Sequence, residues 1–573
     1  MLPLTKRWKI NLSLSEEADR LLHGYPPVLR QILFNRGYTS LEAARRYLEA
    51  AEPPGTDPFQ MMGMAEAVDR LERALRHHEQ IAIYGDYDAD GVTATALLVQ
   101  SLQDLGGEVR GYIPNRFDEG YGLNNEALDH LHSSGVKVVV TVDCGVRSLL
   151  ESEHARKLGL DLIISDHHHP GSELPIAWAV INPKQPGDPY PDKNLAGVGL
   201  AYKLACALHS RVSTQEVNSL DRQDARDQLD LVALGTVADL APLVGENRSL
   251  VRAGLRLIRQ PRRQGLLSLI GASGLKAERI SAGDIGFVIG PRLNAAGRLE
   301  SALAAFDLLT TMDVNEAGRL AQKLEAQNNE RQKLMREIQL AAEELAIAEA
   351  PGALLLFASH ADFNPGVVGL AASRLSELYY RPAIVAQKGE EYTRGSCRSI
   401  PEFHITEALD ECSDLLEHHG GHAAAAGFTV RNENLPALVE KLQAIASTQL
   451  ASLDLRPTII ADAELPLREL TPDLLEYLEW LQPTGYGNPG ALFVSRNLKV
   501  KWPKPVGKDG AHLKMTVNDG WISFDAIAFR QGHWVNKMPT EIDLVYTFEL
   551  NEYNGRKSLQ LNVRDLKPSR TPD

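Results

Sequence analysis

Residues 81–90, IAIYGDYDAD, contain an apolar run followed by three carboxylates in five positions. Two later segments repeat this order: VKVVVTVD ends at Asp143, and LDLIISDHHH has Asp166 directly after its apolar run. Short β-branched runs that alternate with helical stretches are typical of βαβ units, whose parallel sheet is buried on both faces. These segments predict an α/β domain, which we place at residues 56–312.

The pattern changes at several places in the rest of the chain. Residues 1–55 predict a small helical preface, which Pro53-Pro54-Gly55 ends. Residues 313–350 contain no proline and one glycine, and predict a single helix that connects two domains, or else a surface helix of one domain. Residues 351–455 predict a second α/β domain. Residues 456–573 contain short strand-like runs separated by Gly and Asn, which favour an OB-like β-barrel.

Composition limits the class of protein. The chain has 573 residues, enough for three or four domains at roughly 100–200 residues each. Hydrophobic residues make up 44% and charged residues 24%, which excludes a disordered or fibrous chain. The net charge of −15 argues against a protein that binds nucleic acid over its whole surface. Residues 491–573, with 13 basic and 9 acidic residues, carry +4 nevertheless.

The sequence also bears on the compartment. Its four cysteines are far apart and include no C-x-x-C pair, which favours a reducing cytoplasm over a disulfide framework or a zinc ribbon. The first twenty residues lack a continuous apolar segment, so we expect no signal peptide. No apolar run reaches the 18 residues or so that a membrane span needs, so we expect no membrane association.

The acidic segment after residue 84 is the first candidate site. The crevice beyond the carboxyl ends of parallel strands is where ligands bind, and clustered carboxylates repel one another unless a cation offsets them. Asp86 and Asp88 are therefore predicted metal ligands, and Asp90 a cap of the helix that follows. A solvated acidic turn is the alternative. A calcium loop is excluded, because Leu97 stands where that loop needs Glu.

Three further motifs extend this candidate site. Asp143 stands at the end of an apolar strand-like run, which repeats the strand-then-Asp pattern of the first motif. A helix cap is the alternative role for Asp143. Of the three histidines after Asp166, we expect one metal ligand, one acid or phosphate contact and one residue that faces solvent; a surface histidine cluster is the alternative. Asp239, in DLVALGTVADLAPL, follows an apolar helical face. By itself it could be a helix-end residue that faces solvent, and it becomes a candidate ligand only in combination with the other three motifs.

Together these residues suit two divalent cations. The predicted ligands are four carboxylates and one imidazole, with Asp143 in the bridging position: Asp86, Asp88, Asp143, His167 and Asp239. Oxygen ligands with one imidazole favour Mn²⁺ or Mg²⁺. Two such ions can activate water and stabilise an in-line phosphoryl displacement.

These motifs, in this order, resemble those of the DHH phosphoesterase superfamily. Three later segments extend the resemblance: GPRLNAAGRL with Asn294, RGSCRS at residues 394–399 and GGHAAAAGF at residues 420–428. The length, the connecting helix and the C-terminal barrel are similar to those of one branch, the bacterial exonucleases that degrade single-stranded DNA from 5′ to 3′. The resemblance implies a DHH catalytic domain (56–312), a DHH-associated domain (351–455) and an OB-like nucleic-acid-binding domain (456–573).

The resemblance also implies roles for single residues. Asp143 and His168 would be catalytic, and His168 would contact the scissile phosphate or assist proton transfer. Five residues would bind the substrate, three of them at its 5′ phosphate (Arg116, Ser396 and Arg398) and two near the metals (Arg298 and His422). Ordinary salt bridges of Arg116 and Arg298, and a tight helix entry at Gly-Gly-His, are the alternatives.

Tyr84 departs from the pattern of the resembled family. Related sequences often carry His at this position, and tyrosine is a poor ligand for Mg²⁺ or Mn²⁺. We therefore expect one of the two ions to be held weakly.

The activity expected from the resemblance is a two-metal exodeoxyribonuclease that releases 5′-mononucleotides in DNA recombination and repair, including mismatch repair. The expected partners are single-stranded DNA, a single-strand-binding protein and a RecQ-type helicase. A monomer in the cytoplasm, at the nucleoid, is expected. Two alternatives stay open: a DHH phosphodiesterase for very short RNAs or cyclic dinucleotides, and a scaffold that binds nucleic acid without hydrolysing it.

Overall fold

The computed structural model describes residues 5–53, 56–115, 119–120, 122–213, 225–349, 352–553 and 555–569. The chain forms two compact units, which are described separately. The larger unit comprises residues 8–294, 302–321 and 459–573, and the smaller comprises residues 1–7, 295–301 and 322–458.

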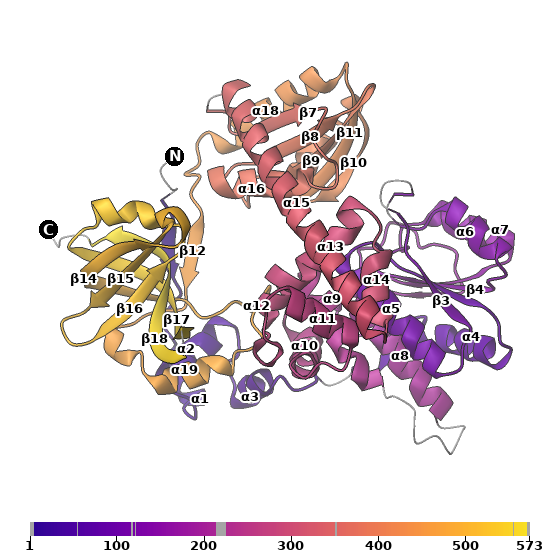
Figure 1. The fold of residues 1–573 in the computed structure, drawn as a ribbon, viewed down its shortest axis with the longest axis horizontal. Coiled ribbons are helices and arrows are strands. Elements are labelled where there is room, and N and C mark those ends of the chain that lie inside the picture. The colour runs from indigo at the N-terminus through magenta and orange to yellow at the C-terminus, as the bar shows by residue number, and fades with distance from the viewer. Residues whose placement is uncertain are drawn as a thin grey trace. The chain divides into compact units, whose positions relative to one another are not determined.

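A five-stranded parallel sheet organises the first half of the larger unit, as predicted (Figure 1). Its order is β3-β2-β4-β5-β6, and each neighbouring pair is parallel. The chain leaves β2 for β3 on one side and then crosses to β4 on the other, so the sheet has its topological switch point between β2 and β4. The strands are β2 Ile81–Tyr84, β3 Val109–Tyr112, β4 Val138–Val142, β5 Asp161–Ser165 and β6 Ala179–Ile181.

Helices cover both faces of this sheet, which explains why β2 and β4 are buried throughout and apolar at every position except Thr141. Helices α6 and α7 lie on one face, and α4, α5 and α8 on the other (Figure 1). Beyond them, α9 is also buried along nearly its whole length. These helices are α4 Met64–Arg76, α5 Ala89–Asp104, α6 Asn125–Ser133, α7 Leu149–Leu158, α8 Gly197–Ser213 and α9 Leu229–Ala238.

A second group of helices follows α9. Among them is a short π-helix, Ile285–Ile289, that continues directly into α13. The α-helices are α10 Gly245–Ile258, α11 Gln264–Ala272, α12 Ala282–Asp284, α13 Gly290–Leu299 and α14 Leu303–Thr310.

The C-terminal strands form a closed barrel, as predicted. Strands β14, β15, β16, β18 and β17 pair in that order, and β14 pairs with β17 to close the ring. Phe493, Tyr546 and Leu561 are among the side chains buried in its core. The strands are β14 Phe493–Val506, β15 His512–Asn518, β16 Ser523–Ala528, β17 Glu541–Tyr553 and β18 Arg556–Pro568, and the two-residue β13 Ala463–Glu464 runs parallel to β14.

The N-terminal helices share the hydrophobic core of this barrel. Leu29, Ile32 and Leu33 of α2 belong to the same buried cluster as Leu474 of α19 and the barrel side chains. The preface is therefore not a separate element at the start of the chain, because its core is completed by residues more than 400 positions away. Its helices are α1 Glu16–Leu21, α2 Pro27–Asn35 and α3 Leu41–Glu49, with α19 at Pro472–Glu479; β1 Arg7–Ile10 pairs with β12 Thr458–Ala461.

Arg248 connects α10 to α3 and to the segment after α19 by hydrogen bonds. Its side chain is 2% exposed, and its guanidinium donates hydrogen bonds of 2.9–3.1 Å to five main-chain carbonyls, those of Tyr47 and of residues 480–483. It also stacks on the Tyr47 ring at 4.2 Å from the ring centroid. One cation thus satisfies the carbonyls at the end of α3 and of the segment after α19, and burial lowers its pKa to about 10.

The smaller unit contains a five-stranded mixed sheet of order β10-β11-β9-β8-β7. Strand β7 is parallel to β8, and the other pairs are antiparallel. Helix α15, Val314–Glu349, contributes residues to both units, as expected of a helix that connects two domains. The remaining elements are β7 Leu356–His360, α16 Val368–Tyr379, β8 Ala383–Lys388, β9 Tyr392–Arg398, α17 Ile405–Asp410, β10 Leu416–His422, β11 Ala425–Arg431 and α18 Leu435–Leu450.

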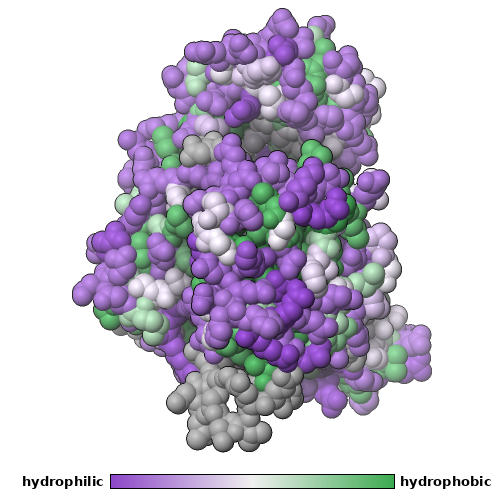
Figure 2. All heavy atoms as spheres, turned by 90° about the vertical axis from the view of Figure 1, so that its right-hand side faces the viewer, coloured by the Kyte–Doolittle hydropathy of each residue, from purple (hydrophilic) through white to green (hydrophobic). Residues whose placement is uncertain are grey.

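Two surface observations complete the fold. No helix among the described residues is long and apolar enough to cross a membrane. Hydrophilic side chains predominate on the face drawn in Figure 2, where hydrophobic residues form small separate groups.

Replacing Arg248 by Met should lower the free energy of unfolding by about 3 kcal/mol or more, because several buried carbonyls lose their donor at once. The stability of Arg248→Lys should lie between that of the wild type and that of Arg248→Met, because an ammonium keeps the charge but lacks the planar fork of donors. The measurement is urea unfolding followed by circular dichroism. Arg156→Met, at an exposed position, is the matched control and should change stability by less than about 0.5 kcal/mol. Equal effects of Arg248→Met and the control would contradict the role of Arg248.

Candidate metal centre

The predicted metal ligands converge at the switch point of the parallel sheet. Asp86 follows β2, Asp143 follows β4, His167 follows β5, and Asp239 comes directly after α9. Because the strands are parallel and adjacent, their carboxyl ends bring these side chains to one edge of the sheet. The solvated acidic turn considered for the first motif is excluded, since Asp86 is 3% exposed.

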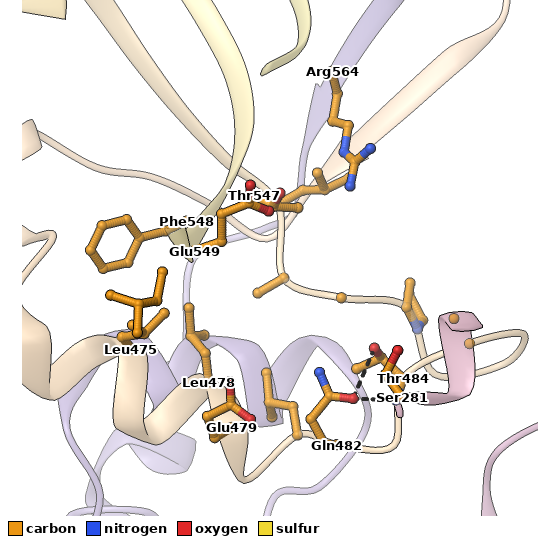
Figure 3. A pocket seen from close by; sticks show the side chains of 18 of the residues that line it. Ser281, Leu475, Leu478, Glu479, Gln482, Thr484, Thr547, Phe548, Glu549 and Arg564 are labelled. Carbon is orange, nitrogen blue, oxygen red and sulfur yellow. Dashed lines mark hydrogen bonds between the residues drawn. The ribbon is translucent and has the colours of Figure 1, made fainter. Parts of the chain in front are cut away.

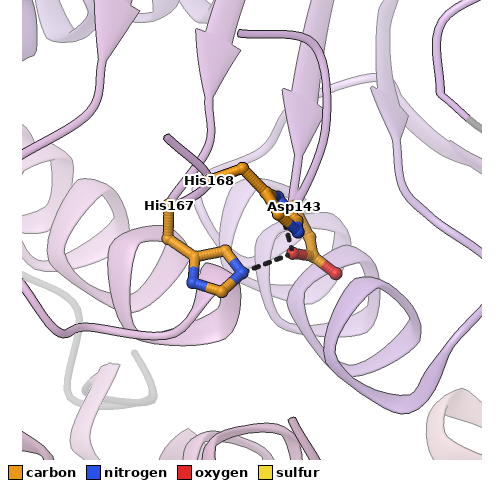
Figure 4. Close-up of side chains that lie close together, drawn as sticks. All are labelled: Asp143, His167 and His168. Carbon is orange, nitrogen blue, oxygen red and sulfur yellow. Dashed lines mark ion pairs between the residues drawn. The ribbon is translucent and has the colours of Figure 1, made fainter. Parts of the chain in front are cut away.

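Asp143 is common to two groups of potential ligand atoms. Oxygens of Asp86, Asp88 and Asp143 lie within 4.8 Å of one another, as do atoms of Asp143, His167 and His168. Figure 4 shows both imidazoles directed toward the Asp143 carboxylate. His167 Nε2 is 3.0 Å from Asp143 Oδ1, and His168 Nδ1 is 3.9 Å from the same oxygen. Asp143 is therefore the residue that the two groups have in common.

A third group of potential ligand atoms also includes His167. Its Nε2 atom is 3.8 Å from Asp239 Oδ2 and 3.9 Å from Asp90 Oδ2, and the three residues form a potential ligand set. Asp239 therefore belongs to the cluster, although it is also the C-cap residue of α9 and its side chain is 24% exposed.

The prediction that Asp90 caps its own helix is wrong. Asp88 is the N-cap of α5, where its Oδ1 accepts from the backbone N–H groups of Asp90 and Gly91. Asp90 instead reaches the start of α8, where its two oxygens accept from Gly197 N at 2.7 Å and Val198 N at 2.8 Å. The first turn of a helix offers free N–H groups and a positive dipole end, so these two hydrogen bonds offset part of the cost of burying the Asp90 carboxylate.

The three histidines differ in burial, as predicted. The side chain of His167 is 12% exposed and that of His168 is 41% exposed, while His169 faces solvent. Asp166 orients His168, because its Oδ1 lies 2.8 Å from His168 Nδ1 and accepts the His168 backbone N–H at 3.0 Å. The Lys184 ammonium donates to the His167 carbonyl at 2.5 Å. A surface histidine cluster is therefore excluded.

Burial and mutual repulsion set the charges in this cluster. Burial, together with the charges of Asp90, Asp88, Asp239 and Asp86, raises the pKa of Asp143 well above its ordinary value. The pKa of Asp90 is raised to about 7 by burial and by Asp88, and that of Asp239 to about 9 by burial, Asp90 and Asp88. The fold therefore stores electrostatic repulsion that a cation would relieve.

The histidines respond to the same surroundings in opposite directions. Burial and the neighbouring His168 lower the pKa of His167 to about 3, so His167 is neutral, the form that binds metals. Burial would lower the pKa of His168 too, but its hydrogen bond to Asp166 and the charge of that carboxylate raise it.

Two orphaned atoms show that the site fits a cation. Asp143 Oδ1 and His167 Nε2 are buried and make no hydrogen bond to any described group, although they lie 3.0 Å apart. Buried polar atoms without partners are rare in native proteins, and a metal between a carboxylate and a neutral imidazole would satisfy both. The oxygen-rich donor set suits Mn²⁺ or Mg²⁺.

The backbone around Asp143 is held in an uncommon conformation. Its φ of +63° lies in the left-handed region, which is unfavourable for a non-glycine residue. Gly197 makes room for it, since a Cβ atom at Gly197 would lie 2.7 Å from the Asp143 Cβ. The close packing fixes the carboxylate between the two groups of ligands.

Tyr84 points away from the cluster. Its hydroxyl donates to Gly122 O at 2.9 Å and accepts from Asn124 Nδ2 at 3.0 Å, and its ring stacks on Tyr112 at 5.1 Å. The side chain packs among α6 and α7 on the other side of the strand end. It contributes no ligand atom, which is consistent with the expectation from sequence that one site lacks a ligand.

The predicted substrate residues of the smaller unit gather at the start of α16. Ser396 and Arg398 lie two positions apart on β9, and a Cβ atom at Gly369 in the first turn of α16 would be 3.3 Å from Ser396 Oγ and 3.1 Å from Arg398 Nη2. Arg298 donates to Gly366 O, three residues before Gly369, at 3.2 Å. A guanidinium, a hydroxyl and a helix N-terminus together favour an anion such as a terminal phosphate.

Two other predicted substrate residues have different outcomes. His422 ends β10, which pairs with β11, so the segment Gly420–His422 belongs to a hairpin and not to the helix entry considered as an alternative. Arg116 lies outside the described residues.

Sequence reasoning missed three residues that support the centre. They are Asp90, Lys184 and Asn294, whose Oδ1 accepts the Ala89 N–H at 2.7 Å beside the Asp88 cap. Asp90 stands in the motif, but only the tertiary contact with Gly197 shows its role. Asn294 stands in a segment that carries the family resemblance, but nothing in its spacing indicates the contact with α5.

Comparisons with known proteins agree with this geometry. Family models match residues 80–236 (DHH family, N-terminal domain), 351–448 (DHHA1 domain) and 461–565 (RecJ OB domain). The single-stranded-DNA-specific exonuclease RecJ of Bacillus subtilis is 38% identical, with 99% of this chain and 72% of that protein covered. The Escherichia coli RecJ is 35% identical, with 96% and 98% covered. The chain belongs to the RecJ family.

A solved RecJ structure has the same fold. The Thermus thermophilus RecJ in complex with Mn²⁺ is 31% identical to this chain and superimposes with a TM-score of 0.83, covering 99% of this chain and 80% of that one. The Mg²⁺ complex of the same protein gives a TM-score of 0.78 at 30% identity, with 99% and 79% covered.

Without divalent metal, the free energy of unfolding of this RecJ family member should fall as pH rises from about 5 to 9. Carboxyls with raised pKa values keep protons in the folded protein that the unfolded chain loses near pH 4, so the folded state binds more protons over this range. The measurement is the melting temperature in EDTA against pH. Saturating Mn²⁺ and the Asp239→Asn substitution should each make the melting temperature depend less steeply on pH. A melting temperature of the metal-free wild type that does not change with pH would contradict this prediction.

Metal titration should find one tight and one weak site in the absence of DNA, since Tyr84 supplies no ligand. Free Mn²⁺ measured by electron paramagnetic resonance during titration counts both sites. Two equal, tight sites would refute the expectation.

Proposed function

We propose that the chain is a metal-dependent exonuclease that degrades single-stranded DNA from 5′ to 3′ and releases 5′-mononucleotides. One observation carries the proposal: buried carboxylates and a neutral imidazole meet around Asp143 at the switch point of the sheet. Membership of the RecJ family, whose relatives carry the name of single-stranded-DNA-specific exonucleases, supports the substrate. The closed C-terminal barrel is a fold that often binds single strands.

The proposed ligands of two Mn²⁺ or Mg²⁺ ions are Asp86, Asp88, Asp143, His167 and Asp239. When bound, these ions supply Lewis-acid activation of water and neutralise charge on the phosphate. Asp143 shares its carboxylate between the two groups of ligands. Asp90, anchored on α8, adds negative charge beside His167 and holds the N-terminus of α8 against the cluster.

His168 is the second catalytic residue of the proposal. Its Nδ1 is engaged by Asp166, which fixes the ring and raises the pKa of the imidazole, so its protonated form is favoured. The partly exposed ring can donate to a phosphate oxygen or give a proton to the departing 3′ oxygen.

Ser396 and Arg398 are proposed to hold the 5′-terminal phosphate at the start of α16, with Arg116 as a third contact. Arg398 donates to its neighbour Cys397 O and forms no ion pair with a described carboxylate, so other N–H groups of its guanidinium are available to an anion. Arg298 and His422 are proposed to contact the substrate near the metals. A hydrolase that engages the 5′ phosphate before cleavage would degrade from that end.

The wider assignment is also proposed. The domain boundaries are those predicted from sequence, with residues 1–55 attached to the barrel. The protein would act as a monomer in the cytoplasm, at the nucleoid, with a single-strand-binding protein and a RecQ-type helicase. Its role would be in recombination and repair, including mismatch repair. No observation favours the cyclic-dinucleotide phosphodiesterase or the inactive scaffold.

Digestion of oligonucleotides tests the activity. With Mn²⁺, a 5′-labelled single strand should yield labelled mononucleotide at once, whereas a 3′-labelled strand should shorten stepwise. Asp143→Asn should lower the rate by at least about 10³-fold, since the shared ligand is lost, and Asp129→Asn, an exposed carboxylate on α6, is the control. Mononucleotide release from the 3′ end first, or no hydrolysis by the wild type, would refute the proposal.

A further inference from the structure

We propose that an arginine-lined groove in the larger unit, apart from the metal centre, grips the sugar-phosphate backbone of the single strand at a second place. The inference rests on the proposed function, because it assigns a further contact to the same substrate.

The arginine groove has a volume of about 420 Å³ and lies along the C-terminal half of α10. Four guanidinium groups line it, and Glu479 is the one carboxylate among its described lining residues. This is a local concentration of positive charge in a chain with a net charge of −15. The arginines are Arg252, Arg256 and Arg259 of α10 and Arg279 of the following 3₁₀-helix, Ala277–Arg279.

Most of this charge is not neutralised by carboxylates. Arg252 donates to Leu48 O at 2.5 Å and Arg259 to Ile280 O at 2.9 Å, and both acceptors are uncharged main-chain carbonyls. Arg256 is exposed and makes no hydrogen bond or ion pair with a described residue. Of the four, Arg279 alone is paired with a described carboxylate. Guanidinium groups held by carbonyls at one edge keep other N–H groups for a phosphate.

A second pocket continues the groove. It has a volume of about 700 Å³ and shares Ser281, Glu479 and Gln482 with the arginine groove. Figure 3 shows its two walls: Thr547, Phe548, Glu549 and Arg564 come from the barrel, whereas Leu475, Leu478 and Glu479 come from α19. The barrel therefore forms one wall of the second pocket, and we refer to the two adjoining pockets as the channel.

The second pocket is also lined by the π-helix, which packs against α9. Phe287 lines the second pocket and is 87% exposed, an unusual position for a phenylalanine. It lies in the π-helix, whose flanking Gly290 is so close to α9 that an added Cβ atom would be 3.1 Å from Ala238 Cβ. Asp239, a proposed metal ligand, is the next residue. An exposed aromatic ring beside this end of the channel is suited to stack a base.

The chemistry favours a phosphate backbone over an acidic peptide. Peptide sites usually bury aromatic or aliphatic anchors, but in the arginine groove Leu255 and Pro483 are the apolar lining residues and the rest are polar or charged. A single strand offers regularly spaced phosphates to the arginines and bases to Phe287, so one ligand uses both features.

Salt dependence of binding tests the inference. The probe is a 5′-phosphorylated 20-nucleotide oligo(dT) with phosphorothioate linkages, and its affinity is measured by fluorescence anisotropy from 50 to 300 mM NaCl. For Arg256→Gln/Arg259→Gln, the slope of log K against log[salt] should become shallower by about 1.4, since each phosphate contact contributes about 0.7 on single strands. Phe287→Ala should weaken binding by at least about fivefold.

Matched controls separate this contact from general electrostatics. Arg156→Gln/Lys157→Gln removes two exposed positive charges at the end of α7 and should leave the slope unchanged. Both groove variants should lose more affinity for the 20-nucleotide strand than for a 4-nucleotide strand. Should the double variant unfold, Arg256→Gln alone should change the slope by about 0.7, because Arg256 has no described contact to lose.

Two outcomes would overturn the inference. One is an unchanged slope in folded groove variants that still digest single strands, which would leave the proposed function standing. The other is a groove variant that loses binding to a poly-glutamate probe but keeps its slope on DNA, since the groove would then serve an acidic protein. Failure of the wild type to digest single strands would instead refute the proposed function.

Discussion

The repulsion among buried carboxylates at the switch point is the constraint on which the rest of the larger unit depends. Asp143 has little exposure and a left-handed backbone, and other carboxylates surround it. Such a cluster persists only where the surrounding fold is rigid enough to hold it. The rigidity has identifiable sources: a parallel sheet buried on both faces, a glycine at position 197 that leaves room for Asp143, and helix N-termini that stabilise Asp88 and Asp90 through backbone N–H groups.

Much of this arrangement could be predicted from the sequence, because parallel topology turns a linear pattern into a spatial one. Apolar runs of strand length that each end in Asp or His place those side chains at the same edge, whatever the loops between them do. Asp86, Asp143 and His167 are found together for this reason. The closed barrel and the long helix α15 were likewise predicted, since strand spacing and the absence of proline are local properties.

Other features could not be predicted, because they depend on contacts between segments far apart in the chain. Asp90 looked like the cap of its own helix, yet it binds the start of α8 more than a hundred residues later. The local sequence predicts only a helical preface over residues 1–55, yet these helices complete the barrel core. Arg248 stands in an ordinary amphipathic pattern, and nothing local indicates that its guanidinium satisfies five carbonyls from two other segments. From the neighbouring sequence alone, Asp90 would be assigned as a helix cap and Arg248 as a surface residue. Their actual roles depend on tertiary contacts, which the neighbouring sequence does not contain.

The arginines of α10 show how one helix can serve stability and binding with the same residue type. Arg248 is buried and its donors are used on carbonyls, so its charge is unavailable to a ligand. Arg256, two turns later on the same helix, is exposed and has no described partner. The difference arises from position along the helix, since the first half of α10 is covered by α3 and the segment after α19, whereas the second half borders an open groove. In an acidic chain, affinity for a polyanion then depends on where positive charge is left unpaired and not on the net charge. The excess of carboxylates elsewhere would disfavour loose association with duplex DNA while leaving this groove attractive to a single strand that the metal centre already holds.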